Sequence, residues 1–213
     1  MDYVDNLEDL HADFSKSKID ISDIGNPLDT FKLWHKMAHD KNCGEPDFMI
    51  LSTVSLENKP SARGVYLRDV TNGTFIFYTN YQSKKGEEMA ANSNVALTFF
   101  WRELEKQIRI EGVCEKVNSA VSDAYFASRP KKSQLGAWAS AQSREIDSRE
   151  KLEAIHQEYA EKFPNEVPRP PHWGGYQVTP NYFEFWQGRP GRLHDRVCCE
   201  LKNGEWKKYR IAP

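Results

Sequence analysis

The fold of this chain is most clearly indicated by one stretch, Ala62-Arg63-Gly64-Val65-Tyr66-Leu67-Arg68-Asp69-Val70-Thr71-Asn72-Gly73-Thr74-Phe75-Ile76-Phe77-Tyr78-Thr79. Two runs rich in β-branched and aromatic residues lie on either side of an Asn-Gly pair, which is the strongest short-range signal for a β-hairpin. We therefore predict a strand over Ala62–Val70, a turn at Thr71-Asn72-Gly73 and a returning strand over Phe75–Thr79.

Further strand-like runs lie on both sides of this hairpin. They are Phe48–Val54, Val95–Trp101, Gln107–Val117, Gly175–Thr179, Tyr182–Gln187, Arg192–Leu201 and Trp206–Ile211. Strands that follow one another in hairpin order, with few helices among them, predict a mainly β (α+β) fold in which an antiparallel barrel carries peripheral helices.

Helix signals are confined to two parts of the chain. Asn26 is a suitable N-cap with Pro27 after it, and Leu28, Phe31, Trp34 and Met37 follow at helical spacing as a core-facing stripe. The other predicted helices are Ser83–Ala91, a helix capped by Ser119 that carries Tyr125 and Arg129 on one face, Lys132–Ala141, and a helix ending near Lys162 whose capping box is Asp147 with Glu150.

Composition favours one domain in the cytoplasm. The chain has 213 residues, of which 39% are hydrophobic, so we expect a flexible polar arm over 1–25 and a single domain over 26–213. A formal net charge of −2 gives no reason to expect nucleic acid as a partner. No apolar run approaches the roughly 20 residues of a membrane span, and the acidic start is unlike a secretory signal.

Metal and disulfide chemistry have little support. The four cysteines form no Cys-x-x-Cys pair, which favours reduced thiols in a cytosolic protein. His35 and His39 are four residues apart, but Lys36 stands where a zinc protease helix has glutamate. We expect no metal.

The segment Phe185–Arg196 holds three arginines, a histidine and an aspartate in twelve positions. On a strand, Arg192, His194 and Arg196 would point to one face, and such a row suits a planar anionic ligand. A solvated charged hairpin is the alternative interpretation of this segment.

Other cations could replace the glycine-rich phosphate cradles that the sequence lacks. Arg63 and Arg68 flank one strand, Lys84 and Lys85 open a short helix, and Arg129 shares a helix face with Tyr125. Together with hydroxyl donors, these groups would suit two separate phosphates. Since the sequence shows no nucleophile beside a base and no metal motif, a bound cofactor is the simplest explanation for any catalytic activity.

Several segments also match a known family, in the same order. They are Lys59-Pro60-Ser61-Ala62-Arg63, Phe77-Tyr78-Thr79-Asn80, Ser83-Lys84-Lys85-Gly86, Gln107-Ile108-Arg109, Tyr125-Phe126-Ala127-Ser128-Arg129-Pro130, Ser133-Gln134-Leu135-Gly136-Ala137-Trp138, Gln142-Ser143, Trp173-Gly174-Gly175, Glu184-Phe185-Trp186-Gln187-Gly188, Arg192-Leu193-His194-Asp195-Arg196 and Arg210-Ile211-Ala212-Pro213. Over nearly everything from Asn26 to Pro213, the chain resembles the pyridoxine (pyridoxamine) 5'-phosphate oxidase family, flavin enzymes of vitamin B6 metabolism.

The resemblance implies an FMN-binding split barrel that forms a homodimer with FMN at the subunit interface. It also implies oxidation of pyridoxine 5'-phosphate or pyridoxamine 5'-phosphate to pyridoxal 5'-phosphate, with O2 reoxidising the flavin to give H2O2.

The resemblance further implies roles for individual residues. The FMN phosphate and ribityl chain would be held by Arg63, Lys84, Lys85, Gln142 and Ser143. The flavin would be lined by the backbone of Gly64, Val65, Tyr66 and Leu67 together with Tyr78, Thr79, Gln107, Trp186 and Arg196, and Arg68 is also expected among the cofactor-binding residues. The substrate phosphate would be bound by Arg68, Tyr125, Arg129 and Ser133. Arg192 and His194 would be the catalytic residues over the pyridine ring.

Three residues depart from the family pattern. Arg68 stands where a lysine is usual, Lys84 stands where an arginine is usual, and Gly64 replaces a larger apolar residue. The family's basic N-terminal segment has no clear counterpart in 1–25. The altered arm, Arg68 and Lys84 leave open a non-catalytic relative that binds FMN or pyridoxal 5'-phosphate as a carrier or sensor. A flavin reductase that uses a nicotinamide cofactor on the same fold is a further, weaker alternative.

Overall fold

The computed structural model describes residues 14–213, so the first thirteen residues of the expected arm lie outside the described residues. The chain forms two compact units. The first unit contains the described part of Met1–Pro46 together with Phe99–Arg109 and Tyr182–Pro213, and the second contains Asp47–Thr98 and Ile110–Asn181. The single domain over 26–213 stays a prediction.

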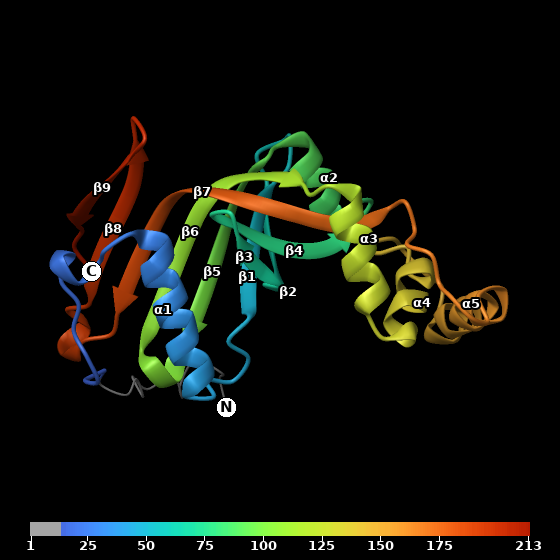
Figure 1. Cartoon of the computed structure of the whole chain (residues 1–213), viewed down its shortest axis with the longest axis horizontal. Helices are drawn as coiled ribbons and strands as arrows, with labels where there is room; N and C mark the ends of the chain where they lie inside the picture. Colours follow the sequence, from blue (N-terminus) through green and yellow to red (C-terminus); the bar gives the residue numbers. More distant parts are fainter. Residues whose placement is uncertain (1–13) are drawn as a thin grey trace, which may run out of the picture. The chain divides into compact units, whose positions relative to one another are not determined.

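Nine strands and five α-helices provide the regular structure of residues 14–213 (Figure 1). The strands are β1 (Phe48–Val54), β2 (Pro60–Tyr66), β3 (Asp69–Thr71), β4 (Thr74–Asn80), β5 (Asn94–Trp101), β6 (Lys106–Lys116), β7 (Trp173–Gln187), β8 (Asp195–Lys202) and β9 (Glu205–Arg210). The helices are α1 (Pro27–Asp40), α2 (Lys84–Ala91), α3 (Ser119–Ser128), α4 (Lys131–Ala139) and α5 (Arg149–Lys162). The strand order is β2-β1-β5-β6-β7-β4-β3, with β8 paired to β7 and β9 paired to β8.

In the second unit, β1 is a central strand with antiparallel neighbours on both sides. It pairs with β2 from Phe48↔Tyr66 to Val54↔Pro60, and with β5 around Leu51↔Leu97. Alternate side chains of β1, including Met49 and Leu51, are fully buried, as expected for a strand with one face on the core.

The prediction of one continuous strand over Ala62–Val70 is wrong. The chain changes partners at Leu67, whose N–H donates to the Asp47 carbonyl at 2.9 Å, while the N–H of Arg68 donates to the Ile76 carbonyl at 2.8 Å. As a result β2 pairs with β1, and only the short β3 forms the predicted hairpin with β4. The Asn-Gly turn itself is confirmed, since φ is +49° at Asn72 and +79° at Gly73.

The predicted helices of the second unit are present, with two caps displaced by one residue. Ser83 caps α2 by accepting from the N–H of Gly86. Asn118 rather than Ser119 caps α3, and Ser148 rather than Asp147 caps α5, because these side chains accept from backbone N–H groups inside the first turn. Arg129 follows the last residue of α3 as its C-cap, with extended backbone, so it is not on a helix face as predicted.

In the first unit, α1 packs its apolar stripe against aromatic side chains. The ring centroids of Phe31 and Phe99 are 5.1 Å apart, and those of Trp34 and Phe185 are 5.3 Å apart. The Asn26 cap is confirmed. Met37 was expected in this stripe but is 36% exposed, and Ala38 takes the core position.

The end of the chain folds as an antiparallel meander of the first unit. Gly175–Thr179 and Tyr182–Gln187 were predicted as two strands but belong to the single long strand β7. Its last residues pair with β8, and β8 pairs with β9. The mainly β antiparallel fold with peripheral helices is thus confirmed. Within residues 14–213, no helix has the length and apolar character needed to cross a membrane.

Candidate functional site

The second unit contains a cavity of about 780 Å³, a volume typical of small-molecule sites. Many of the residues expected to bind ligands line it: Arg63, Gly64, Val65, Tyr66, Arg68, Tyr78, Thr79, Lys84, Lys85, Tyr125, Arg129, Ser133, Gln142 and Ser143. The remaining lining residues, for which no role was expected from the sequence, are Ser61, Ala62, Asn80, Gly136, Ala137, Ser140 and Trp173.

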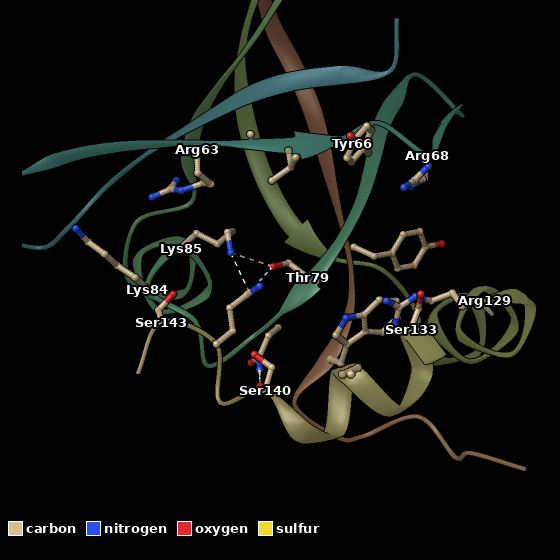
Figure 2. Close-up of a pocket in the computed structure, with 18 of the residues that line it drawn as sticks. Arg63, Tyr66, Arg68, Thr79, Lys84, Lys85, Arg129, Ser133, Ser140 and Ser143 are labelled. Carbon is tan, nitrogen blue, oxygen red and sulfur yellow. Dashed lines mark hydrogen bonds between the residues drawn. The ribbon is translucent and has the colours of Figure 1, made fainter. Parts of the chain in front are cut away.

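The cations of this cavity form two separate groups (Figure 2). Arg63, Lys84 and Lys85, which we call the first cation group, lie on one side of Thr79. Arg68 and Arg129, the second cation group, lie on the other side. Such an arrangement can hold two anionic groups at a distance from each other, which agrees with the two phosphate sites expected from the sequence.

Lys85 is the buried member of the first cation group, with only 8% of its surface exposed. Its Nζ donates to the hydroxyl of Thr79 at 3.2 Å and to the side-chain oxygen of Gln142 at 3.0 Å. Desolvation, helped by the charge of Arg63, lowers the pKa of Lys85 to about 8. The contacts to Thr79 and Gln142 are neutral, so an anion beside Lys85 would stabilise its charged form.

The first cation group also lies at the N-terminus of α2. Lys84 and Lys85 are the first two residues of this helix, after the Ser83 cap. A helix N-terminus carries partial positive charge, so two lysines are unfavourable there unless an anion is bound. The chemistry of this donor set therefore fits a phosphate.

Not every nitrogen of the Arg129 side chain, in the second cation group, has a hydrogen-bond partner. Among the described residues, its Nη1 is the one buried side-chain nitrogen or oxygen without a hydrogen-bond partner. Burial lowers the pKa of Arg129. Ser133, in the first turn of α4, lines the same part of the cavity and could donate to the same ligand. A buried guanidinium nitrogen without a partner is costly, so this atom marks where an anionic ligand group would bind.

Three aromatic rings stack beside Arg129. The centroids of Tyr78 and Tyr125 are 3.8 Å apart with an interplanar angle of 12°, and those of Tyr78 and Trp173 are 5.6 Å apart. Two glycines follow Trp173, and a Cβ at the second, Gly175, would lie 2.9 Å from the Tyr78 ring, so β7 needs glycine there to lie this close to the stack.

Six of the expected site residues do not line this cavity. Leu67 belongs to the second unit but is buried, with 4% of its surface exposed. The others belong to the first unit: Gln107, Trp186, Arg192, His194 and Arg196.

In the first unit, His194 and Trp186 lie side by side, with ring centroids 4.7 Å apart. The N–H of Arg189 donates to Nδ1 of His194 at 3.1 Å, so the neutral imidazole carries its proton on Nε2. Burial, and then the charge of Arg192, lower the pKa of His194. Phe14, from the expected arm, contacts both rings edge-on at 5.7 and 6.0 Å.

The expected row of Arg192, His194 and Arg196 on one strand face is wrong. Strand β8 begins only at Asp195, and Arg192 lies in a 3-10 turn over Pro190–Arg192. Gly191 and Arg192 have φ values of +61° and +59°, and two consecutive left-handed residues cannot belong to an extended strand.

Arg196 is held by a buried carboxylate that was not expected from the sequence. Its Nε donates to Glu184 at 2.8 Å, and Nη1 of Arg109 donates to the same carboxylate at 2.9 Å. Glu184 is 1% exposed. Its place next to Phe185 on the hydrophobic β7 was the available signal, because a carboxylate in a buried strand requires cationic partners.

Comparison with known proteins agrees with this geometry. Residues 36–163 match the family described as pyridoxamine 5'-phosphate oxidase, and residues 173–213 match the pyridoxine 5'-phosphate oxidase C-terminal dimerisation region. A Cyanothece sp. protein named pyridoxine/pyridoxamine 5'-phosphate oxidase is 48% identical, over 98% of this chain and 99% of that protein. A Cupriavidus necator protein of the same name is 47% identical, over 97% and 99%.

Solved structures confirm the split-barrel fold. The crystal structure of PhzG from Burkholderia lata 383, in complex with tetrahydrophenazine-1-carboxylic acid, has a TM-score of 0.88 and 27% identity, covering 95% of this chain and all of that one. An FMN-binding protein of Nostoc punctiforme described as related to pyridoxamine 5'-phosphate oxidase has a TM-score of 0.68 and 14% identity, covering 85% of this chain and 96% of that one, and shows the fold alone.

Proposed function

The chain is an enzyme of the pyridoxamine 5'-phosphate oxidase family, and from this premise we propose that it binds FMN and oxidises pyridoxine 5'-phosphate or pyridoxamine 5'-phosphate to pyridoxal 5'-phosphate. O2 is the final electron acceptor and becomes H2O2. The observation that carries the proposal is the cavity with two separate cation groups, because this reaction brings together two small molecules that each bear a phosphate.

The first cation group binds the FMN phosphate in this proposal. Arg63, Lys84 and Lys85 provide charge at the N-terminus of α2, and Gln142 and Ser143 provide neutral hydrogen-bonding groups next to them. The residues of β2 and β4 that line the same cavity, namely Gly64, Val65, Tyr66, Tyr78 and Thr79, lie where they can contact the ribityl chain and the flavin ring. Bound FMN supplies the hydride acceptor.

The second cation group binds the substrate phosphate. Nη1 of Arg129 gains the partner that it lacks, and Arg68, Tyr125 and Ser133 complete the set of donors. Holding a phosphate far from the reacting carbon restricts the orientation of the pyridine ring, and such orientation lowers the activation barrier.

Arg192 and His194 act on the pyridine ring. The imidazole of His194 is neutral near pH 7 and can donate from Nε2 to a substrate oxygen or nitrogen, since Nδ1 already accepts from Arg189. The guanidinium of Arg192 would hold the pyridine ring from its other side and so restrict its orientation.

We propose that the active unit is a homodimer with the cavity at the subunit interface. The match to a dimerisation region covers 173–213, which contains Trp186, Arg192, His194 and Arg196. None of these residues lines the cavity of the second unit within one chain. A partner subunit can supply them, which would make the site complete only in the dimer.

The direct test is to supply the purified protein with FMN and each substrate, and to measure pyridoxal 5'-phosphate and H2O2 together. Equal amounts of the two products, lost in Arg192→Ala and His194→Ala, are the expected result. Tight FMN or pyridoxal 5'-phosphate binding without O2 consumption would instead favour a carrier or sensor, and NADPH oxidation would favour a flavin reductase.

A further inference from the structure

A buried carboxylate lies directly behind the first cation group. Glu88, on α2, is 6% exposed and does not line the cavity. It accepts hydrogen bonds from the hydroxyls of Thr53 at 2.5 Å and Ser61 at 2.7 Å, and from Nη2 of Arg63 at 3.2 Å. Lys84 approaches its other oxygen at 3.9 Å. One carboxylate therefore joins β1, β2 and α2 at the point where the cations meet.

Glu88 is ionised near neutral pH. Burial by itself raises the pKa of this carboxyl, but the hydrogen bonds from Thr53 and Ser61 and the charges of Arg63 and Lys84 outweigh it, so the pKa of Glu88 lies below its ordinary value. A buried negative charge is stable only with such compensation.

The contacts of Glu88 fix the guanidinium of Arg63. Besides its bond to Glu88, Arg63 donates from Nη1 to the carbonyl of Leu51 at 3.2 Å and to the hydroxyl of Thr53 at 2.6 Å. Nη2 also donates to Ser61 at 2.5 Å. A side chain that is already held in place loses little entropy when a ligand binds it, which favours affinity.

The charges around the site also match a phosphate monoester. Arg63, Lys84 and Lys85 are close together with Glu88 among them, which leaves a formal charge of +2 when all four are ionised. A phosphate monoester carries about −1.5 to −2 at pH 7. Glu88 also favours the charged form of Lys85 against desolvation and the repulsion of Arg63.

We propose that Glu88 is a positioning residue of the phosphate site: it orients Arg63 and limits repulsion among the three cations, so that the site selects a phosphorylated flavin over the same flavin without phosphate. This inference rests on the proposed function, since it assigns the first cation group to FMN. Glu88 does not touch the ligand and acts through Arg63 and Lys85.

The test compares FMN with riboflavin, which lacks the phosphate. Flavin fluorescence titrations of the full-length, flavin-free protein give both dissociation constants for the wild type, Glu88→Gln and the control Glu153→Gln. Glu153 is a matched control because it is an exposed glutamate on α5, where it pairs with Arg149 at 2.8 Å. We expect Glu88→Gln to weaken FMN binding about tenfold, which corresponds to about 1.4 kcal/mol, and to change riboflavin binding less than about twofold.

A pH series distinguishes positioning from a structural role. In Glu88→Gln, Lys85 loses the carboxylate that favours its protonation, so FMN affinity should begin to fall at a lower pH than in the wild type. The charged groups that act on Lys85 are Arg63 on β2 and Glu88 on its own helix, while the contacts from Thr79 and Gln142 are neutral. Riboflavin affinity should show no such shift.

Several outcomes would overturn the inference. Equal losses of affinity for FMN and riboflavin would show that Glu88 only supports the fold, and unchanged or tighter FMN binding would show that its charge merely opposes the phosphate.

A second variant is available if Glu88→Gln does not fold. Thr53→Val removes one donor to Glu88 at nearly constant volume, and it should weaken the binding of FMN but not of riboflavin. A wild-type protein that binds neither flavin would refute the proposed function itself, whereas phosphate selectivity retained in Glu88→Gln would refute this inference alone.

Discussion

The guanidinium carbon of Arg129 lies 4.4 Å from the centroid of the Trp173 ring, while Nη1 of the same guanidinium is buried without a hydrogen-bond partner. The ring stabilises the charge from one side, and the nitrogen leaves one strong donor available to a ligand. This combination suits a binding group that is arranged before its anion arrives.

Replacing Arg129 should therefore weaken substrate binding without lowering the stability of the protein. Arg129→Met removes the donor, and a lost hydrogen bond to a charged group corresponds to roughly a tenfold to hundredfold rise in KM for pyridoxine 5'-phosphate. Thermal stability should not fall, because the variant also removes an unsatisfied buried group. Steady-state kinetics and thermal melts of Arg129→Met and the exposed control Arg149→Met measure both effects. Unchanged KM would contradict the assignment.

FMN affinity should depend on the protonation of Lys85. Its pKa is lowered to about 8 without ligand, and a bound phosphate favours the charged form. Above that pH, binding must take up a proton, so affinity should fall as pH rises from 8 to 9. Isothermal titration in buffers of different ionisation enthalpy reports this proton uptake. Lys85→Arg, which stays charged, should lose the dependence, and the same slope in that variant would contradict the assignment.

The titration of His194 should respond to Arg192. Burial and the charge of Arg192 hold the pKa of His194 below its ordinary value of 6.5. Removing that charge in Arg192→Ala favours the imidazolium, so the pKa of His194 should rise, whereas Arg192→Lys should leave it low. NMR titration of the flavin-free protein measures the pKa, and a downward shift in Arg192→Ala would refute the electrostatic account.

Two glycines near the cavity should respond to alanine in opposite ways. A Cβ at Gly86 would lie 2.3 Å from the Tyr81 carbonyl oxygen, so Gly86→Ala forces a backbone shift and should cost about 2–3 kcal/mol of unfolding free energy. A Cβ at Gly136 meets nothing within 4 Å on α4, so Gly136→Ala should stabilise by about 0.5–1 kcal/mol. Denaturant melts of the flavin-free variants compare them, and equal effects would argue against the close contact at Gly86.

The sequence predicted most helices and strands, but not the positions where the chain passes from one neighbouring strand to another. Residues on both sides of Leu67 favour strands equally, so propensity alone predicted one strand over Ala62–Val70. The break is determined by the carbonyl of Asp47, which takes the N–H of Leu67 in the folded chain. Similarly, the strand predicted over Arg192–Leu201 begins only at Asp195, because the left-handed conformation of Arg192 was not foreseeable from residue type.

The cavity was better predicted than its supporting residues. The cations of the site were recognisable because Arg63, Lys84 and Lys85 belong to short motifs. Glu88 was missed because a glutamate on a short charged helix is ordinarily solvated. Only the packing of α2 against β1, with the Thr53 hydroxyl 2.5 Å away, shows that this carboxylate is buried.

The most direct test of the proposed function is the visible spectrum of the FMN-loaded protein during addition of pyridoxine 5'-phosphate, first without O2 and then in air. We expect the flavin absorption band to bleach without O2 and to return in air, with one pyridoxal 5'-phosphate formed for each flavin reduced. A flavin band that remains unchanged after substrate addition would contradict the account.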